Sequence, residues 1–328
     1  MIITDTRLDK AAKKFATPYK LDRPVLSPAT DPASFDSRFV DLPYIYKHGD
    51  TWYMTYVGFN GRGYKTGLAV SSDLITWKKQ GIILDWGSRS DFDSCGAAAT
   101  WILRDNDYVN PAPLAHEGKY WMTYYGNNDI GLEAGIGHIG LAFSDDLETW
   151  HKHDRNPILS CGDGGSWEKG SLYKGCLIRR DGTFYLFYNA KNKQFPPWKE
   201  QIGLAMSKNL STWERYAGNP ILPNSREGWD SIYTADPQVV SFDGSWVMFY
   251  YGYGGYNAQN GFALSDDLIT WKKYPEPLLP ASPPVRFDDQ CAHKPFVIEK
   301  DGIVYHFYVA VGESSDIRHI AVATSEPV

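Results

Sequence analysis

Short segments in which apolar and polar residues alternate recur along the chain, always in the same order. A glycine-led aromatic segment such as GDTWYMTYVG or GKYWMTYYG comes first, followed by an apolar segment such as TGLAV or IGLAF. A turn-like string of the type SDDLxTW comes next, with its tryptophan at positions Trp77, Trp150, Trp213 and Trp271. An apolar segment such as NPILS closes the unit. Period-two alternation rich in aromatic and β-branched residues predicts four short strands in each unit.

The number of these units predicts the fold class. Consecutive tryptophans of the turn strings are 58 to 73 residues apart. The glycine that opens the aromatic segment occurs five times, at Gly49, Gly118, Gly182, Gly244 and Gly302. Repeats of four antiparallel strands are typical of propellers. We therefore predict an all-β fold, a five-bladed β-propeller with four antiparallel strands in each blade.

The two ends of the chain are complementary. The last unit runs to Val328 without a turn string or a closing segment, whereas RPVLSP at residues 23–28 matches the closing segments NPILS and NPILP. An N-terminal strand that completes the last blade would remove two exposed sheet edges. We expect a ring closed in this way and a single domain spanning residues 1–328.

Composition and charge exclude several classes of partner. The chain has 33 Lys and Arg against 39 Asp and Glu, a net charge of -6, so it lacks the basic excess of nucleic-acid-binding proteins. No apolar run approaches the ~20 residues that span a bilayer, so no membrane partner is expected. The N-terminal segment has no apolar core of a secretory signal, and the four cysteines show no metal spacing. We expect a cytoplasmic protein with reduced thiols.

Positions that are alike in every unit are expected to serve the scaffold. The turn strings are predicted to be closed by their aspartate in an Asx-type turn. Each unit also opens with an aromatic–acid pair, for which we predict a turn cap or a hydrogen bond between blades. These pairs are Phe35-Asp36, Phe92-Asp93, Trp167-Glu168, Trp229-Asp230 and Phe287-Asp288.

One position is polar in all five units but differs in type. Eight residues before the repeated glycine stand Asp41, Asn110, Lys174, Asp236 and Lys294. First strands of a propeller converge on its axis, so these side chains are predicted to ring the mouth of a central funnel. A solvated rim would also be polar. The mixture of carboxylates, ammonium groups and an amide favours a catalytic ring over a rim.

With these features the sequence resembles the five-bladed β-propeller glycosidases, above all glycoside hydrolase family 43 and its relatives in families 117 and 130. The resemblance covers essentially the whole chain and rests on the GLAxSxDLxTW turns, the NPIL segments and the FDS and WDS openers. It implies an aspartate base in blade one, a pKa-modulating aspartate in blade three and a glutamate acid in blade four. Asp41 would be the base. Asp236 stands in the acid's blade but is one methylene shorter, and Lys174 stands where the modulator is expected.

Inverting glycosidases keep two carboxyl groups ~6.5–9.5 Å apart so that water fits between them. Blades one and four are not neighbours, so Asp41 and Asp236 are predicted to face each other across the funnel. Lys174 and Lys294 would flank Asp236 and lower its pKa, which is unsuitable for an acid. Other candidates for the proton donor are His293, Glu313 and Glu168.

Loops after the aromatic segments supply candidates for sugar binding. Amide and charged groups hydrogen-bond to sugar hydroxyls, and aromatic faces stack on sugar rings. Each residue is also compatible with an ordinary polar loop, so the prediction rests on the set. These loops supply Asn60, Arg62, Asn128, Trp198, Tyr253 and Tyr256. Together with the ring residues Asn110, Lys174 and Lys294 and with Arg38, they are the predicted substrate-binding residues.

Three functions fit this pattern. The first is an inverting, exo-acting glycosidase for small oligosaccharides, including anionic ones that would suit Lys174 and Lys294. The second is a phosphorylase in which those lysines, with Arg38 or Arg62, cradle phosphate. The third is a saccharide-binding propeller without catalysis. No cofactor is required. Related propellers can hold an axial cation such as Ca²⁺, but no ligand spacing here indicates one.

Overall fold

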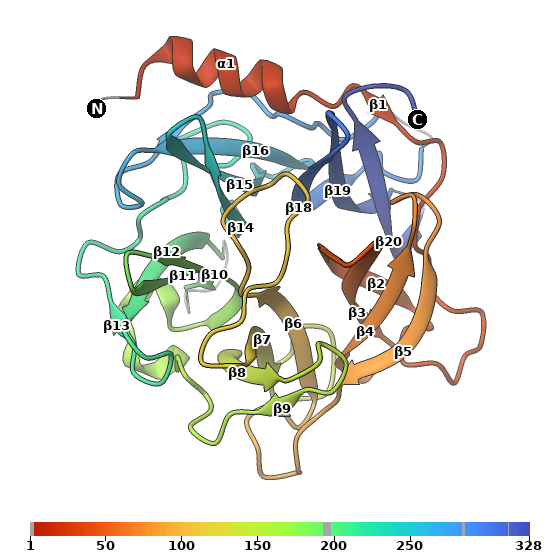
Figure 1. Cartoon of the computed structure of the whole chain (residues 1–328), viewed down its shortest axis with the longest axis vertical. Helices are drawn as coiled ribbons and strands as arrows, with labels where there is room; N and C mark the ends of the chain where they lie inside the picture. Colours follow the sequence, from red (N-terminus) through yellow and green to blue (C-terminus); the bar gives the residue numbers. More distant parts are fainter. Residues whose placement is uncertain (1–2, 193–197, 284–285, 314) are drawn as a thin grey trace.

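Antiparallel strands make up most of the regular structure in the computed structural model of this chain, which describes residues 3–192, 198–283, 286–313 and 315–328. In the described residues they form five groups, called units 1 to 5 (Figure 1). Units 1 and 2 consist of β2 (Phe39–His48), β3 (Thr51–Phe59), β4 (Tyr64–Ser71) and β5 (Lys78–Leu84), then β6 (Gly96–Ile102), β7 (Tyr120–Asn127), β8 (His138–Ser144) and β9 (His151–Lys152). Units 3 and 4 consist of β10 (Ser171–Arg180), β11 (Thr183–Lys191), β12 (Glu200–Ser207) and β13 (Glu214–Arg215), then β14 (Tyr233–Phe242), β15 (Ser245–Tyr253), β16 (Ala258–Ser265) and β17 (Lys272–Lys273). Unit 5 consists of β18 (Cys291–Lys300), β19 (Ile303–Gly312) and β20 (Ser315–Thr324), with β1 (Tyr19–Lys20) beside β20.

The first strands of the units lie around the centre of the molecule (Figure 1). β2 contacts β6, β6 contacts β10, β10 contacts β14, β14 contacts β18, and β18 contacts β2. Single parallel residue pairs link unit 3 to unit 4 and unit 4 to unit 5, so these three units share one hydrogen-bonded sheet. The prediction of an all-β chain with propeller-like repeats is confirmed.

The N-terminal segment packs against the last strand of the chain. In β1, Tyr19 pairs with Thr324 of β20, and further along the backbone N–H of Val25 donates to the carbonyl of Ile320 at 2.8 Å. Leu26 forms a bridge with the same residue. The segment that matches the NPIL pattern therefore pairs with unit 5, as the sequence predicts.

The repeated opener acids form one network in every unit. The acid accepts a hydrogen bond from a tyrosine of the second strand, at 2.8 to 3.2 Å, and pairs with a cation next to the third strand, at 2.5 to 3.1 Å. In unit 5 this cation is Lys20 of β1, which comes from the other end of the chain. The scaffold role predicted for the openers is confirmed. The five trios are Asp36–Tyr56–Lys79, Asp93–Tyr124–Lys152, Glu168–Tyr188–Arg215, Asp230–Tyr250–Lys273 and Asp288–Tyr308–Lys20.

The turn strings close on themselves, as predicted. Asp73 Oδ1 accepts hydrogen bonds from the backbone N–H groups of Ile75 and Thr76 at 2.8 and 2.7 Å. The indole N–H of Trp77 donates to the carbonyl of Leu74 at 3.0 Å. The same Asx-type turn is formed around Asp146, Asn209 and Asp267.

A helix precedes the strands, which the strand pattern did not predict. The helices are α1 (Asp5–Phe15) and two 3-10 turns, η1 (Cys161–Asp163) and η2 (Ser166–Glu168). The spacing of Leu8, Ala11 and Phe15 places them on one face of α1, and all three are buried. They pack against apolar side chains of β14 to β16, β18 and β19, so α1 covers the outside of units 4 and 5.

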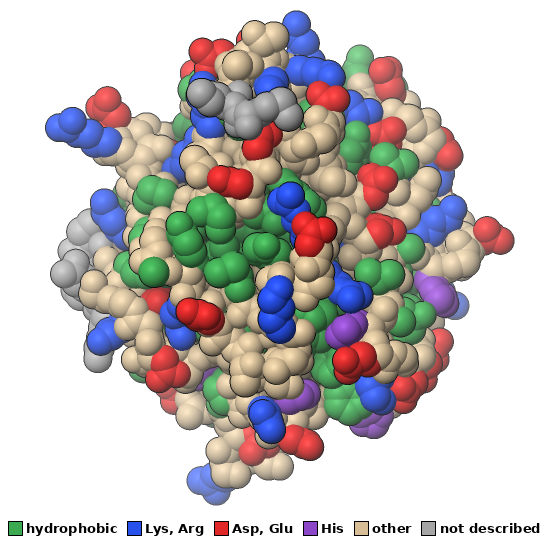
Figure 2. Space-filling view, turned by 60° about the vertical axis from the view of Figure 1, so that its left-hand side comes forward, with side chains coloured by type: hydrophobic (Ala, Val, Ile, Leu, Met, Phe, Trp, Pro, Cys, Tyr) green, Lys and Arg blue, Asp and Glu red, His purple; other side chains and the backbone are tan. Residues whose placement is uncertain are grey.

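The surface carries charges of both signs. Figure 2 shows Lys and Arg side chains interspersed with Asp and Glu over the visible face, instead of a patch of one sign. Among the described residues, no helix has the length and apolar character needed to cross a bilayer.

Candidate active site

Bulges at one end of the first strands direct polar side chains toward the centre. The pairing shifts between Ala235 and Gln238 in unit 4 and between His293 and Phe296 in unit 5. Within these bulges Asp236 and Lys294 each have a φ of 57°, which re-aims their side chains. Both residues precede a proline, and so does Leu42 in unit 1.

In unit 1 the bulge places Leu42, and not the predicted Asp41, at the position that Asp236 and Lys294 occupy in their units. Leu42, with a φ of 47°, is the structural counterpart of Asp236 and Lys294, whereas Asp41 lies one residue earlier on the strand. In unit 2 the prediction is wrong for another reason. Strand β6 ends at Ile102, and Asn110 belongs to a longer segment that follows. Asn110 is exposed, and its backbone N–H donates to the carbonyl of Glu299.

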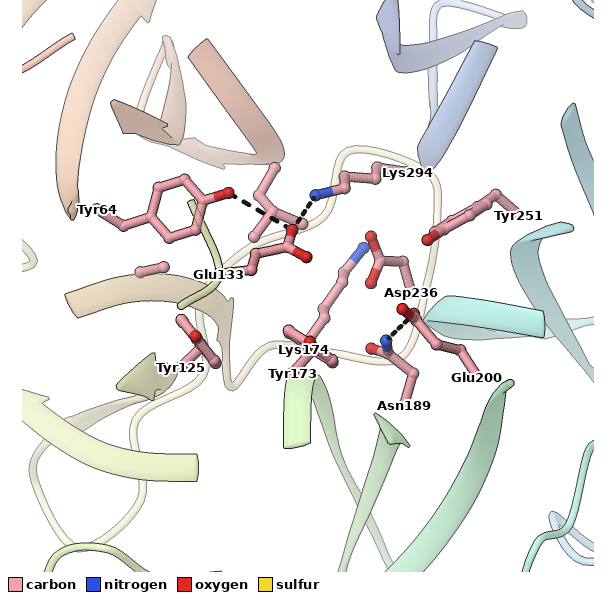
Figure 3. Close-up of a pocket in the computed structure, with 12 residues that line it drawn as sticks. Tyr64, Tyr125, Glu133, Tyr173, Lys174, Asn189, Glu200, Asp236, Tyr251 and Lys294 are labelled. Carbon is pink, nitrogen blue, oxygen red and sulfur yellow. Dashed lines mark hydrogen bonds and ion pairs between the residues drawn. The ribbon is translucent and has the colours of Figure 1, made fainter. Parts of the chain in front are cut away.

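The bulges border a small, partly open cavity of about 30 Å³, which is room for about two water molecules (Figure 3). Of the residues predicted for the site, Lys174, Asp236 and Lys294 lie here. The lining also includes two glutamates and four tyrosines. In full, it consists of Leu42, Tyr64, Ala98, Tyr125, Glu133, Tyr173, Lys174, Asn189, Glu200, Asp236, Tyr251 and Lys294.

Asp236 is a buried carboxyl group whose charged form is disfavoured. It is 4% exposed, and within the described residues its Oδ2 has no hydrogen-bond partner. Burial raises the pKa of Asp236, although Lys294 and Lys174 act in the opposite direction. The two lysines act in the predicted direction, but the expected net lowering of the pKa is wrong, because the loss of hydration outweighs their attraction. Figure 3 shows the Lys174 ammonium group directed toward Asp236.

Glu200 has the properties of a proton donor and was not predicted. It begins β12 and is 6% exposed. Asn189 Nδ2 donates to its Oε2 at 3.1 Å, and Lys191 Nζ lies 3.7 Å from its Oε1. Burial raises the pKa of Glu200 to about 7, and the charges of Glu133 and Asp236 add to the rise. Such a carboxyl group holds or releases a proton near neutral pH.

Glu133 lies on the other side of the cavity from Glu200 (Figure 3). It belongs to the loop between β7 and β8, and its side chain is 28% exposed. The Tyr64 hydroxyl donates to Glu133 Oε1 at 3.5 Å. Lys294 Nζ and Arg318 Nη1 lie 3.8 and 4.0 Å from the same oxygen. The cavity therefore has a carboxyl group on each of two facing sides.

Asp41 is bound in an ion-pair cluster and is absent from the cavity lining. Its carboxylate accepts from Lys294 Nζ at 3.1 Å and from Arg318 Nη1, and it is 0% exposed. Burial alone would raise its pKa, but Lys294 and Arg318 outweigh that effect and hold the pKa of Asp41 well below its usual range. Asp41 therefore lies beside Lys294 and outside the cavity lining, and its facing Asp236 across the funnel stays a prediction.

The other predicted proton donors lie in unsuitable environments. Burial, together with the charges of Lys294 and Arg318, lowers the pKa of His293 to about 3, so the ring is neutral at pH 7. Its Nδ1 lies 2.9 Å from the carbonyl oxygen of Val309, which fixes the proton on that nitrogen. Glu168 is held in the scaffold network described above, and Glu313 is exposed. None of the three lines the cavity, whereas Glu200 does.

The predicted sugar-binding loops are only partly near the cavity. Trp198 does not line the cavity, but Lys191, which lies 3.7 Å from Glu200 Oε1, lies 4.7 Å from the centre of the Trp198 ring. Tyr253 packs against Tyr233 at 5.3 Å. The remaining side chains do not line the cavity. These are the exposed Arg38, Arg62, Asn128 and Tyr256 and the partly buried Asn60.

Internal comparison of the repeats could have found Glu200. It stands three residues before the glycine of its GLA segment, where the other units have Tyr64, Gly137 and Ala258. A lone carboxyl group at a position that varies between units is the signal. Comparison of the repeats could not have found Glu133 or Arg318. Glu133 lies in the loop between β7 and β8, whose length differs from its counterparts, and Arg318 lies in β20 of the incomplete last repeat.

Comparison with known proteins agrees with this fold. A solved structure described as a complex of BT0996 and RGII has a TM-score of 0.88 and 32% identity, covering 100% of this chain and 97% of its counterpart. A second structure, described as "Glycoside hydrolase", has a TM-score of 0.88 and 31% identity over the same shares. Both similarities extend over the whole chain.

Among curated proteins, "1,2-beta-oligomannan phosphorylase" from Thermoanaerobacter sp. (strain X514) is 30% identical over 176 residues. The match covers 52% of this chain and 48% of the relative, so the chain spans about half the length of that protein. The model of the family described as "Glycosyl hydrolases family 32 N-terminal domain" matches residues 105–285, more than half of the chain. The chain therefore belongs to this family, and the resemblance of its sequence to propeller glycosidases is confirmed.

Proposed function

We propose that this protein is a glycoside hydrolase in which Glu200 is the general acid and Glu133 is the facing carboxylate. The observation that carries the proposal is the environment of Glu200, whose burial at a small pocket raises its pKa to about 7. Glycoside hydrolysis needs one carboxyl group that keeps its proton and one that is ionised. Glu133 faces Glu200 across the cavity and lies beside the cations Lys294 and Arg318.

Unpartnered polar atoms support a saccharide as the substrate. Asp236 Oδ2, Asn189 Oδ1 and the Tyr125 hydroxyl are buried without a hydrogen-bond partner within the described residues, and all three residues line the cavity. Sugar hydroxyls can donate to the first two atoms and pair with the third. The small size of the cavity favours exo-action on a single terminal sugar. Because a sugar ring exceeds the present volume, we expect the loop that carries Glu133 to move when substrate enters.

The facing arrangement of Glu133 and Glu200 favours inversion of configuration. A carboxylate across the cavity from the acid can activate a water molecule on the opposite face of the sugar. The stereochemistry can be read by NMR, which detects the anomer formed first. Inversion is expected to give the anomer opposite to that of the substrate, and net retention would contradict this part of the proposal.

Water is favoured over phosphate as the acceptor because the cations at the cavity are already engaged. Lys294 and Arg318 pair with Asp41 and Glu133, and Lys174 faces Asp236. Arg38 and Arg62, the other parts of the predicted phosphate cradle, do not line the cavity. The phosphorylase remains the second candidate, because a relative that covers half of the chain bears that name.

We also infer that units 1 to 5 are the blades of one closed five-bladed propeller. The contact between β18 and β2 supports closure, and so does the pairing of the N-terminal segment with β20. Lys20, which completes the opener network of unit 5, supports it independently.

Product analysis over a panel of oligosaccharides tests the function. The panel includes β-1,2-linked oligomannan and RGII, which the names of the two relatives suggest, each with and without inorganic phosphate. We expect phosphate-independent release of a terminal sugar, at a rate that Glu200→Gln lowers strongly. Strict dependence on phosphate would replace the hydrolase with the phosphorylase. Binding without turnover in the wild type would leave only a saccharide-binding role.

A further inference from the structure

A second buried cluster of unpaired polar groups lies outside the candidate active site. Arg104 follows β6 and is 2% exposed, yet Nε, Nη1 and Nη2 all lack a hydrogen-bond partner within the described part of the chain. The buried indole Nε1 of Trp101, on the same strand, also lacks one. Arginine and tryptophan side chains only donate hydrogen bonds, so both residues present donors without acceptors.

The surroundings of Arg104 place it at the centre of the molecule. Its guanidinium carbon lies 6.0, 5.0 and 5.3 Å from the ring centres of Tyr44, Trp101 and Phe296. These rings come from β2, β6 and β18, the first strands of units 1, 2 and 5. Contact with aromatic faces stabilises the positive charge in part, but it supplies no acceptor for the N–H groups.

Nearby acidic groups do not supply the missing acceptors. Asp105 is the next residue in the chain, but its Oδ2 accepts from the backbone N–H of Ala112 at 3.3 Å. Its Oδ1 is buried without a partner of its own, so it is not bonded to Arg104. The Tyr44 hydroxyl donates to the carbonyl of Ile102 at 2.6 Å. A buried cation with its donors unsatisfied is unfavourable unless an acceptor joins it.

We propose that Arg104 and Trp101 Nε1 bind a small monovalent anion, a halide such as chloride, at the centre of the propeller. An anion accepts from several N–H groups at once and balances the guanidinium charge. A metal cation would need oxygen ligands and would be repelled by Arg104, so this site opposes the axial Ca²⁺ considered from the sequence. The site is separate from the candidate active site, whose lining contains neither residue.

Crystallography with bromide tests the site directly. Crystals grown with sodium bromide in place of chloride are measured at the bromine absorption edge. We expect an anomalous peak within hydrogen-bond distance of the Arg104 nitrogens and Trp101 Nε1. Ordered water without an anomalous signal at this place would overturn the proposal.

Thermal unfolding tests the site in solution. Melting temperature is followed against chloride, with gluconate holding the ionic strength constant, and should rise to a plateau for the wild type. Arg104→Met should abolish this rise. Trp101→Phe keeps the ring and removes one donor, so it should raise the apparent Kd about tenfold and gives a result even if Arg104→Met does not fold. The exposed Arg62→Met is the matched control and should respond like the wild type. Equal responses of the wild type and Trp101→Phe would contradict the proposal.

Discussion

Replacement of Glu200 by glutamine should make the protein more stable at alkaline pH while it removes the general acid. The pKa of Glu200 is raised from its ordinary 4.5 to about 7, chiefly by burial. A carboxyl group with a raised pKa contributes stability below its unfolded pKa, and this contribution is lost as pH rises through the folded pKa. The loss therefore falls between about pH 4.5 and pH 7. A rise of this size corresponds to about 3 kcal/mol in the free energy of unfolding.

Denaturant unfolding at pH 5 and pH 8 measures this effect. The free energy of unfolding of Glu200→Gln minus that of the wild type should increase by about 2 to 3 kcal/mol between the two pH values, because a small part of the loss has already occurred at pH 5. The exposed Glu276→Gln is the matched control, for which the difference should not change. A difference that is independent of pH for Glu200→Gln would refute the reasoning, because Glu200 would then ionise like an exposed carboxyl group.

The kcat of Glu200→Gln distinguishes a general acid from a residue that only positions its neighbours. Loss of general acid catalysis typically costs 10²- to 10⁴-fold in kcat. The loss should be large for natural oligosaccharides, whose leaving group needs a proton, and small for aryl glycosides with a strongly acidic leaving group. Equal losses for both classes of substrate would assign Glu200 a positioning role.

Three further changes probe the neighbouring groups. Asp41→Asn leaves Lys294 and Arg318 with only the more distant, partly exposed Glu133 and should lower the free energy of unfolding by about 3 kcal/mol, as measured with denaturant. A variant of wild-type stability would show that this cluster is not structural. Asp236→Asn removes a charge that raises the pKa of Glu200, so the alkaline limb of the pH–rate profile should move to lower pH, and an unchanged limb would argue against their coupling. Lys20→Met removes the closer cation of the buried Asp288 and leaves only Arg286 Nε at 3.6 Å, so it should lower the free energy of unfolding more than Lys10→Met, at an exposed ion pair, which should cost less than about 1 kcal/mol.

The repeat pattern shows which features can be predicted from neighbouring residues. The turn strings close through hydrogen bonds that span two or three residues, as at Asp73, so the sequence of each turn is sufficient to predict it. The opener acids were assigned to the scaffold because all five units carry them, and every one forms the same trio. Helix α1 was missed although Leu8, Ala11 and Phe15 have helical spacing, since it precedes the repeats and shares none of their period-two alternation.

The candidate site needed the tertiary structure because its properties arise between units. A bulge in β2 places Leu42 where an alignment by spacing places Asp41, and this one-residue shift moves the carboxylate out of the cavity. Lys294 and Arg318 hold Asp41 across more than 250 residues of sequence.

The sequence by itself therefore determined the repeated strands, their turns and the shared scaffold, because these depend on local hydrogen bonds and on a pattern repeated five times. Only the tertiary structure decided which carboxyl group keeps a proton. The pKa values of Asp236 and Glu200 follow from burial and from charges contributed by several units, and such a sum of distant effects is not encoded in any single repeat.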